Sequence, residues 1–247
     1  MTRRRWIADE WDQTSAVLRN AQAAHLARVL RAQVGQEFDI VAGTEVRRGV
    51  IENIREDAVE LSLHETLDAT TCLPLVLALS IIRYERMEWA IEKLTELGVA
   101  RIVPLIAQRT EKHLAQAAQK RTERWRKIAH ESAQQSRRSD IPEISDPIPV
   151  ANYLSEGPDA LHLLLSEHER ARSLRGCLEN ADGPEIYSAT APRTICAAIG
   201  PEGGWTDGEV VSFAKYGWQS VSLGSRILRA ETAAIAVASV LSSWLGP

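Results

Sequence analysis

From residue 73 onward the chain alternates apolar stretches with amphipathic ones, and this rhythm restricts its fold more than any other feature. The first apolar stretch covers 73–82, and later ones cover 99–106, 160–165, 194–199 and 219–223. Between them, apolar residues recur at the spacing of a helix face. Apolar strands that alternate with amphipathic helices are typical of a parallel β-sheet covered on both faces. We therefore predict an α/β fold with a parallel sheet for residues 73–247.

Specific residues mark the helix boundaries in this part of the chain. The first helix has its apolar face at Met87, Ala90, Ile91, Leu94 and Leu97, and Gly98 ends it. The segment from Thr206 to Glu209 has the pattern of a capping box, so it begins another helix, which Gly217 ends. The last helix carries one apolar stripe, made of Ala234, Val237, Ala238, Leu241 and Leu245.

Residues 1–70 follow a different pattern, which predicts a separate small domain. Val59, Leu61 and Leu63 alternate with polar residues at the two-residue period of a half-buried strand, and a turn is expected at 43–44. One helix is expected over 23–30, with Gly35 as its stop. We predict two domains, a small β domain at 1–70 and the α/β domain at 73–247.

The composition is that of an ordinary globular protein and excludes several classes of function. Of 247 residues, 45% are hydrophobic and 25% charged, and the net charge is −4. A polycation is excluded, so contact with nucleic acid requires a local basic patch. The three cysteines form no CxxC pair, which argues against a disulfide framework and a thiolate zinc site. Without a signal-peptide pattern or an apolar run long enough to span a bilayer, we expect a soluble cytoplasmic protein with no membrane partner.

Two loops that follow predicted strands are the first candidates for a site. In open parallel sheets ligands bind at the carboxyl ends of the strands. The first loop, 200–204, reads GPEGG, and glycines without a Cβ let backbone N–H groups approach a ligand closely. The second loop, 222–232, carries Arg226, Arg229 and Glu231 in apolar surroundings. A lone glycine cluster is more often a tight turn, but two such loops on neighbouring strand ends favour a binding site.

Familiar catalytic motifs are absent from the two loops. GPEGG lacks the Lys-Ser/Thr ending of a P-loop, no GxGxxG follows the first strand, and no GxSxG occurs. No cluster of metal ligands is visible in the sequence, so we expect no metal. Arg229 and Glu231 have a structural alternative as an ion pair, and Glu231 another as a cap at the start of the last helix.

A basic stretch covers residues 120–138, with a net charge of +5. If Trp125 lies on the buried side of a helix, the basic side is either a solvated face or a surface for a polyanion. Arg3, Arg4 and Arg5 add basic character to the small domain. We predict an RNA surface spread over both domains, with the candidate residues Arg28, Arg31, Arg124, Lys127, Arg137 and Arg138.

Five sequence blocks together resemble the ribosomal RNA small subunit methyltransferase E family, within the SPOUT or trefoil-knot methyltransferases. The most specific are AAIGPEGGWTDGEV and VSLGSRILRAETAAIAVASVL, in the order found in the family. HLARVLRAQVGQ (25–36), RMEWAIEKLTELGVARIVPL (86–105) and RWRKIAHESAQQSRR (124–138) extend the resemblance nearly end to end. One departure is the segment 83–86, which reads RYER where many relatives have a lysine and a glycine.

The resemblance implies an enzyme that transfers a methyl group from S-adenosylmethionine to N3 of one uridine in 16S ribosomal RNA. The RNA partner would be the small ribosomal subunit or its precursor. The resemblance also implies a PUA-like β-barrel at 1–70, a homodimer, and a knot at about 195–245. The implied cofactor-binding residues are Leu165, Gly200, Pro201, Glu202, Gly203, Gly204, Leu223, Gly224, Ile227, Leu228, Thr232 and Ala233.

Methylation of uridine N3 needs help from the protein, because this nitrogen is a poor nucleophile until its proton leaves. Arg229 can stabilise the charge that spreads to O2 and O4 of the uracil, as an oxyanion hole does. Glu231 can accept the N3 proton, directly or through water, or it can orient Arg229. The target base must be unpaired or flipped to reach the site. Two alternatives stay open: a SPOUT methyltransferase acting on another RNA atom, such as a ribose 2′-OH, and a non-catalytic RNA-binding assembly factor.

Overall fold

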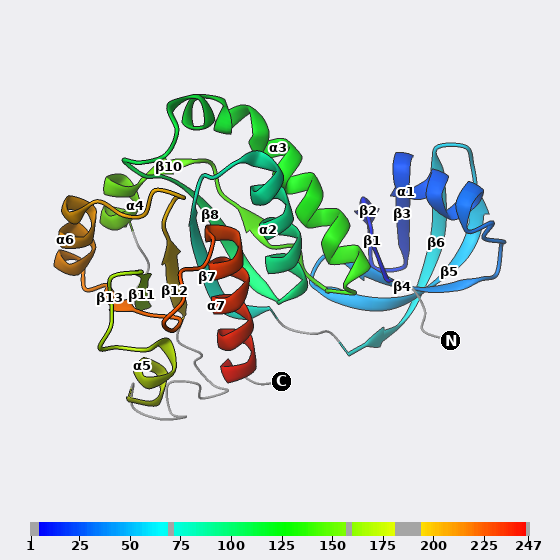
Figure 1. Cartoon of the computed structure of the whole chain (residues 1–247). Coiled ribbons are helices and arrows are strands. Elements are labelled where there is room, and N and C mark those ends of the chain that lie inside the picture. Colours follow the sequence, from blue (N-terminus) through cyan, green and yellow to red (C-terminus); the bar gives the residue numbers. More distant parts are fainter. Residues whose placement is uncertain (1–4, 69–71, 157–159, 181–193, 246–247) are drawn as a thin grey trace. The chain divides into compact units, whose positions relative to one another are not determined.

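The computed structural model describes residues 5–68, 72–156, 160–180 and 194–245 (Figure 1). The chain divides into two compact units. The smaller contains Met1–Thr71 together with Glu131–Ile141, and the larger contains Cys72–His130 together with Pro142–Pro247. The segment 131–141 therefore groups with the N-terminal part of the chain, although it lies far along the sequence.

The larger unit is built on a seven-stranded sheet with the order β10-β8-β7-β12-β11-β13, to which β9 adds at β8. Every strand pairing in this sheet is parallel, which confirms the α/β fold predicted from the alternating apolar pattern. The strands are β7 (Leu73–Ser80), β8 (Val99–Ile106), β9 (Glu143–Ile144), β10 (Ile148–Pro149), β11 (Leu161–Leu165), β12 (Ile195–Ile199) and β13 (Gln219–Val221).

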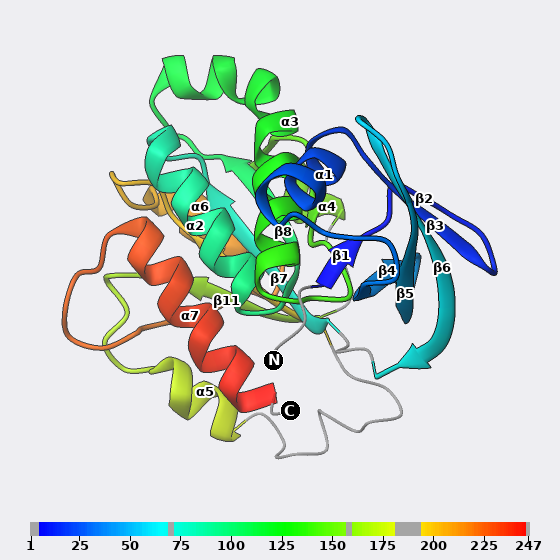
Figure 2. The same ribbon diagram turned by 90° about the vertical axis from the view of Figure 1, so that its right-hand side faces the viewer.

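Helices cover both faces of this sheet, because successive strand residues point to opposite sides and both sides are apolar. On β7, Leu75, Leu77 and Leu79 belong to one buried cluster, whereas Val76 and Ala78 belong to another. The first cluster is completed by α2, α3, α5 and α7, and the second by α4 and α6. Figures 1 and 2 both show α2 lying alongside α7. The helices are α2 (Tyr84–Glu96), α3 (Lys112–Gln135), α4 (Val150–Glu156), α5 (Leu174–Asn180), α6 (Asp207–Lys215) and α7 (Ala230–Leu245).

The expected stop and start signals in this unit are confirmed. Gly98 follows α2 with φ +86°, and Gly217 follows α6 with φ +79°, a left-handed conformation that glycine adopts without strain. The Thr206 side chain accepts a hydrogen bond from the Glu209 backbone, and the Glu209 side chain accepts one from the Thr206 backbone. The sequence pattern therefore identified the capping box correctly.

The smaller unit contains a six-stranded sheet with the order β1-β4-β5-β6-β3-β2. All of its pairings are antiparallel except that of β1 with β4. In the described residues the hydrogen-bonded order ends at β1 and β2, so this sheet is open, and the barrel expected for 1–70 is not closed by strand pairing. The strands are β1 (Arg5–Ile7), β2 (Glu10–Trp11), β3 (Ser15–Arg19), β4 (Glu37–Ala42), β5 (Glu45–Ile54) and β6 (Ala58–Leu67).

The first helix of the chain ends near the predicted position but not at the predicted stop residue. It consists of α1 (Asn20–Ala24), continued by a π-helical segment, η1 (His25–Val29). Arg31 has φ +51° just after it, so the chain leaves the helical direction before it reaches Gly35. The prediction of Gly35 as the stop was wrong, because a non-glycine residue makes the left-handed turn. Among the described helices, none is both long and apolar enough to cross a membrane.

Candidate functional site

A cavity of about 390 Å³ lies at the carboxyl ends of β11, β12 and β13. The last residue of each strand, Leu165, Ile199 and Val221, contributes to its wall. Carboxyl ends of parallel strands meet at one edge of a sheet, and the loops that follow them surround this opening. The cavity thus lies where the two loops predicted from the sequence come together.

Most of the residues expected to bind a cofactor line this cavity. They are Leu165, Gly200, Pro201, Glu202, Gly204, Leu223, Gly224, Ile227, Leu228 and Ala233. Arg229 also lines the cavity, whereas Gly203, Thr232 and Glu231 are not among its lining residues. The absence of Gly203 has a local cause, since a Cβ built on it would point at Arg109, with 3.3 Å to the Arg109 Cβ.

The GPEGG loop is held in a conformation that a bulkier residue would disturb. Gly204 has φ +69°, and a Cβ built on it would lie 2.9 Å from Oε1 of Glu167. The Gly204 N–H donates to the Pro201 carbonyl at 2.8 Å, which closes the turn. Trp205 then donates from Nε1 to the Leu165 carbonyl at 3.1 Å, so the loop is fixed to the end of β11.

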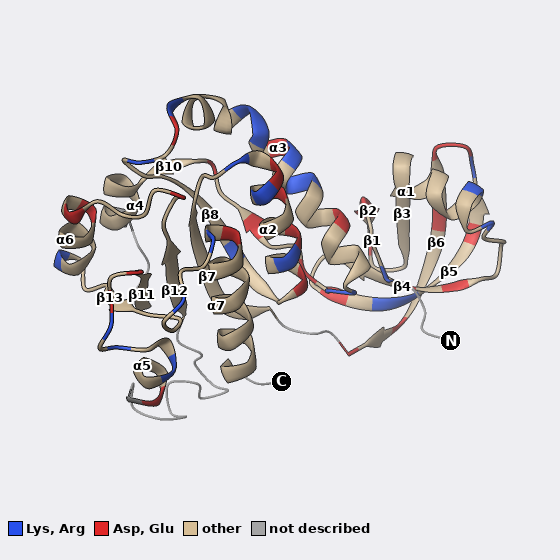
Figure 3. Cartoon of the chain, viewed as in Figure 1, with Lys and Arg blue, Asp and Glu red and all other residues tan. Residues whose placement is uncertain are grey.

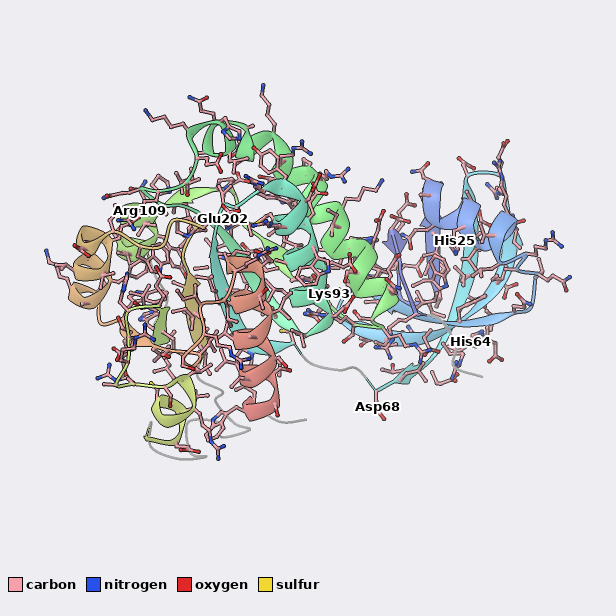
Figure 4. All side chains as sticks on the ribbon, in the orientation of Figure 1. His25, His64, Asp68, Lys93, Arg109 and Glu202 are labelled. Atoms are coloured by element: carbon pink, nitrogen blue, oxygen red, sulfur yellow. The ribbon has the colours of Figure 1, made fainter. Side chains whose placement is uncertain are left out.

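Arg109, in the loop after β8, holds the same turn, although β7 lies between β8 and β12 in the sheet (Figure 4). Its guanidinium donates to the carbonyl of Gly203 at 2.8 Å and to that of Trp205 at 3.2 Å. The Gln108 backbone N–H donates to Glu209 at 2.8 Å, which ties this loop to the start of α6 as well. The GPEGG turn is therefore anchored by polar contacts from two strand ends, β8 and β11.

The second loop is joined to the loop that follows β11. The Ser222 N–H donates to the Arg172 carbonyl, and the Leu174 N–H donates to the Ser222 carbonyl, both at 2.9 Å. The Ser222 hydroxyl accepts from the Gly224 N–H at 3.0 Å, and Gly224 has φ +122°, which requires a glycine. Further along, Ile227 is 76% exposed and Leu228 is 37% exposed. Two apolar side chains are thus presented to solvent next to the cavity.

Arg86, from the first turn of α2, connects the two loops. Its NH1 lies 3.3 Å from Oε1 of Glu202, and its Nε lies 3.6 Å from Oε1 of Glu231. Glu231 is 5% exposed, and its other oxygen, Oε2, has no hydrogen-bond partner among the described residues. Burying a carboxylate oxygen without a hydrogen-bond partner costs free energy of folding. Such a residue is therefore a candidate for a functional role. The structural alternative of an Arg229–Glu231 ion pair is not found here, since Arg86 is the partner of Glu231.

Arg229 lies just before α7 and is exposed. Within the part of the chain that the structure describes, its side chain has no ion pair or hydrogen bond. Glu231 lies in the first turn of α7, where a carboxylate is favoured by the helix dipole. The Arg229 guanidinium is therefore available to a ligand in the cavity, whereas the Glu231 carboxylate is buried beside the cavity.

Comparison with known proteins places this arrangement in a family. Residues 70–242 match the family described as an RNA methyltransferase domain. The ribosomal RNA small subunit methyltransferase E of Synechocystis sp. is 33% identical over 224 residues, covering 90% of this chain and 70% of that protein. The protein of the same name from Rickettsia conorii is 34% identical over 214 residues, covering 85% and 82%. This chain belongs to the ribosomal RNA small subunit methyltransferase E family.

A solved structure of the same family agrees with the fold. The ribosomal RNA small subunit methyltransferase E of Neisseria gonorrhoeae, bound to S-adenosyl methionine, has a TM-score of 0.84 with this chain. The two sequences are 26% identical, and the alignment covers 98% of each chain. The similarity therefore extends over both compact units of this methyltransferase E family member.

The two buried thiols are poor candidates for a nucleophile in this methyltransferase E family member. Burial raises the pKa of the Cys196 thiol to about 11, and burial also raises the pKa of the Cys177 thiol. Both thiols therefore stay protonated near neutral pH, and only the thiolate is nucleophilic. No group of three or more metal-ligating side chains occurs in the described residues.

The basic residues on α3 are mostly at the surface, where Figure 3 shows Lys and Arg along the helix. Arg124 and Lys127 are exposed, while Trp125 and Ala129 on the other side of the helix are buried. Arg124 makes a two-point ion pair with Glu88, with distances of 2.7 and 2.8 Å. It must leave or share this partner to contact a phosphate.

The remaining RNA candidates lie in the smaller unit and differ in accessibility. Arg28, Arg31 and Arg137 are exposed, and Arg28 lies 3.1 Å from Glu56. Arg138 is 7% exposed and pairs with Asp140, so its prediction as a surface contact was wrong. The sequence pattern could not show that Asp140 holds the guanidinium inward. Arg3 and Arg4 lie outside the described residues.

Proposed function

We propose that this chain transfers a methyl group from S-adenosylmethionine to N3 of a uridine in 16S ribosomal RNA. The observation that carries this proposal is the cavity at three strand ends, formed by the GPEGG loop and the LGSRILRAET loop. It occurs in a member of the methyltransferase E family, whose Neisseria relative was solved with S-adenosyl methionine bound. The substrate would be the small ribosomal subunit or its precursor.

The cavity has the features that S-adenosylmethionine requires. Ile199, Leu223 and Leu228 supply apolar contact, and the GPEGG turn offers backbone groups with no side chain in front of them. We assign binding to the loops 200–204 and 223–228 and to the chain at Leu165, with Ala233 and Thr232 on α7 behind them. When bound, S-adenosylmethionine supplies an activated methyl group on its sulfonium.

Arg229 and Glu231 have separate roles in the proposed mechanism. Arg229 is exposed on the cavity and unpartnered among the described residues, so its guanidinium is available for the negative charge on O2 or O4 of the uracil. Glu231 is buried and is not part of the cavity wall, so it does not contact the uracil directly. We therefore assign to it the N3 proton, which reaches its unpartnered Oε2 through water. Arg86 fixes the other oxygen of this carboxylate.

Recognition of the RNA is assigned to the basic residues of both units. In the smaller unit we propose a PUA-like RNA-binding domain at 1–70, with Arg28 and Arg31 as phosphate contacts, and Arg137 from the segment 131–141 of the same unit as a third. In the α/β domain at 73–247, Arg124 and Lys127 on α3 have the same role. We further propose a homodimer, and a trefoil knot over about 195–245, as in SPOUT methyltransferases.

Nucleoside mass spectrometry of ribosomal RNA tests the reaction. A bacterial strain without its own methyltransferase E is complemented with this chain or with an Arg229→Ala variant. We expect 3-methyluridine in 16S ribosomal RNA with the unaltered chain and much less of it with the variant. A 2′-O-methylated nucleoside instead would identify a different target atom, and no new modification would favour a non-catalytic assembly factor.

A further inference from the structure

Three arginines surround the cavity, and the structure gives none of them a carboxylate partner. Arg170 comes from the loop after β11, and Arg226 and Arg229 come from the loop after β13. All three are exposed, and none makes a side-chain hydrogen bond or ion pair within the described residues. Neighbouring like charges repel each other, so this arrangement favours an anion that can be shared among them.

The other charged groups of the cavity are already engaged. Arg86 is paired with Glu202 and Glu231. The Glu167 carboxylate lies 3.7 Å from His168. Glu169, beside Arg170, accepts backbone N–H bonds from Ala171 at 2.7 Å and Arg172 at 3.0 Å. Its carboxylate thus binds the loop backbone, and none of these carboxylates forms an ion pair with Arg170, Arg226 or Arg229 within the described residues.

The two loops that carry these arginines form one braced unit. Ser173 and Ser222 make a parallel β-bridge between them. The Ser222 N–H donates to the Arg172 carbonyl, so the backbone next to Arg170 is fixed relative to the start of the second loop. The hydrogen bonds between Ser222 and Gly224, at 3.0 and 3.1 Å, fix the turn that leads to Arg226. Loop backbones that are already ordered lose less entropy when the arginines they carry bind an anion.

We propose that Arg170 and Arg226 bind the phosphate groups on either side of the target uridine. The inference rests on the proposed function and deepens it, because it names the residues that hold the flipped nucleotide. A base that enters a pocket leaves its two flanking phosphates at the mouth, where these two exposed arginines lie. Arginine suits this task, since its planar guanidinium binds phosphate oxygens through two parallel hydrogen bonds. Arg229 stays assigned to the uracil.

The cofactor carboxylate is the other anion that these arginines can attract, and two measurements separate the sources. The variants are Arg170→Gln, Arg226→Gln and their combination. Arg175→Gln is the matched control, because Arg175 lies on α5, pairs with Glu179 at 2.7 Å and is not part of the cavity wall. Affinity for S-adenosylmethionine is measured by calorimetry without RNA. Next, kcat/KM is measured over a salt series on small ribosomal subunits that lack the methyl group.

We expect each glutamine variant to bind S-adenosylmethionine like the unaltered enzyme. Each should lower kcat/KM about tenfold at low salt, the effect of losing a hydrogen bond to a charged group. Each should also flatten the plot of log kcat/KM against log salt by about 0.7, the value for one phosphate contact on a single strand. Arg226→Lys should restore the slope because it restores the charge, and Arg175→Gln should match the unaltered enzyme.

Two results would overturn the inference. Unchanged salt slopes in the double variant would show that the arginines touch no phosphate. A loss of S-adenosylmethionine affinity that accounts for the whole loss of kcat/KM would assign them to the cofactor carboxylate. Failure of the proposed function itself is recognised separately, because the unaltered enzyme would then form no 3-methyluridine on these subunits.

Discussion

Replacement of Gly204 by alanine tests whether the GPEGG turn must keep its observed conformation. Gly204 has φ +69°, and for an L-residue this left-handed conformation costs about 1–2 kcal/mol. The added Cβ would also lie 2.9 Å from Oε1 of Glu167. That oxygen ends a flexible side chain which is 40% exposed, so it can move away at little cost. The backbone conformation should therefore account for most of the effect.

A turn that is destabilised by this amount should bind its cofactor more weakly. A change of 1–2 kcal/mol alters an equilibrium by about 5–30-fold, and the apparent Kd rises by the same factor if the alanine shifts the loop away from the binding conformation. Calorimetry with S-adenosylmethionine measures this Kd, and urea unfolding measures the free energy of unfolding. We expect the Kd to rise about 5–30-fold, and the free energy of unfolding to change by well under about 1 kcal/mol, because a shifted loop relieves the strain in the free enzyme and the cost returns only on binding.

Two further variants control for other causes. Gly208→Ala changes a glycine within α6 that has nothing within 4 Å of an added Cβ, so affinity should be unchanged and stability equal or higher by up to about 1 kcal/mol. Glu167→Ala combined with Gly204→Ala removes the close contact but leaves the backbone strain. Full recovery of affinity in this double variant would refute the backbone argument. An affinity within twofold of the unaltered enzyme in Gly204→Ala alone would refute the role of the turn.

Four further predictions follow from the site. Arg229→Ala should lower the single-turnover rate by about two to three orders of magnitude at every pH, with cofactor affinity unchanged, because an electrostatic stabiliser of the uracil is lost. Glu231→Gln should be slow near neutral pH and recover partly as pH rises and the free N3 anion forms; an unaltered rate at neutral pH would remove the base assignment. Arg109→Ala should weaken cofactor binding by about 1.5–3 kcal/mol in calorimetry, since two carbonyls of the GPEGG turn lose a charged donor. Charge reversal at Arg124 and Lys127 should flatten the salt dependence of RNA binding by nearly one unit per lost contact, and an unchanged slope would return α3 to a solvated face.

The sequence predicted the architecture of the larger unit well because its signals are local. Each apolar run is short and bounded, and Gly98, Thr206 and Gly217 mark helix ends within one turn of the true boundary. Two-residue strands give no such pattern. The strands β9 and β10 lie in a proline-containing segment, and they are recognised only by their pairing with β8.

The site was predicted in its loops but not in its supports. Glycines and charged residues in 200–204 and 222–232 are visible in the sequence, because both loops follow predicted strands. Arg86 and Arg109 were missed as site residues, since their partners are 116 and 94 residues away along the chain. No local pattern carries that information. Arg138 illustrates the converse, because a basic run looks uniform in sequence although Asp140 holds one of its members inside.

The contacts of the charged residues divide them into two groups with different tasks. Arg86 and Arg109 are engaged by carboxylates or carbonyls of the two loops, so their charge is used to hold protein backbone and side chains in place. Arg170, Arg226 and Arg229 have no such partner among the described residues, although each lies on the same cavity. A guanidinium whose hydrogen bonds are already made to the protein gains little binding free energy from a substrate. An unpartnered guanidinium instead gains a full charge-assisted hydrogen bond. Replacement of the first group should therefore weaken cofactor binding through the shape of the loops, and replacement of the second should affect RNA and catalysis while the loops stay intact.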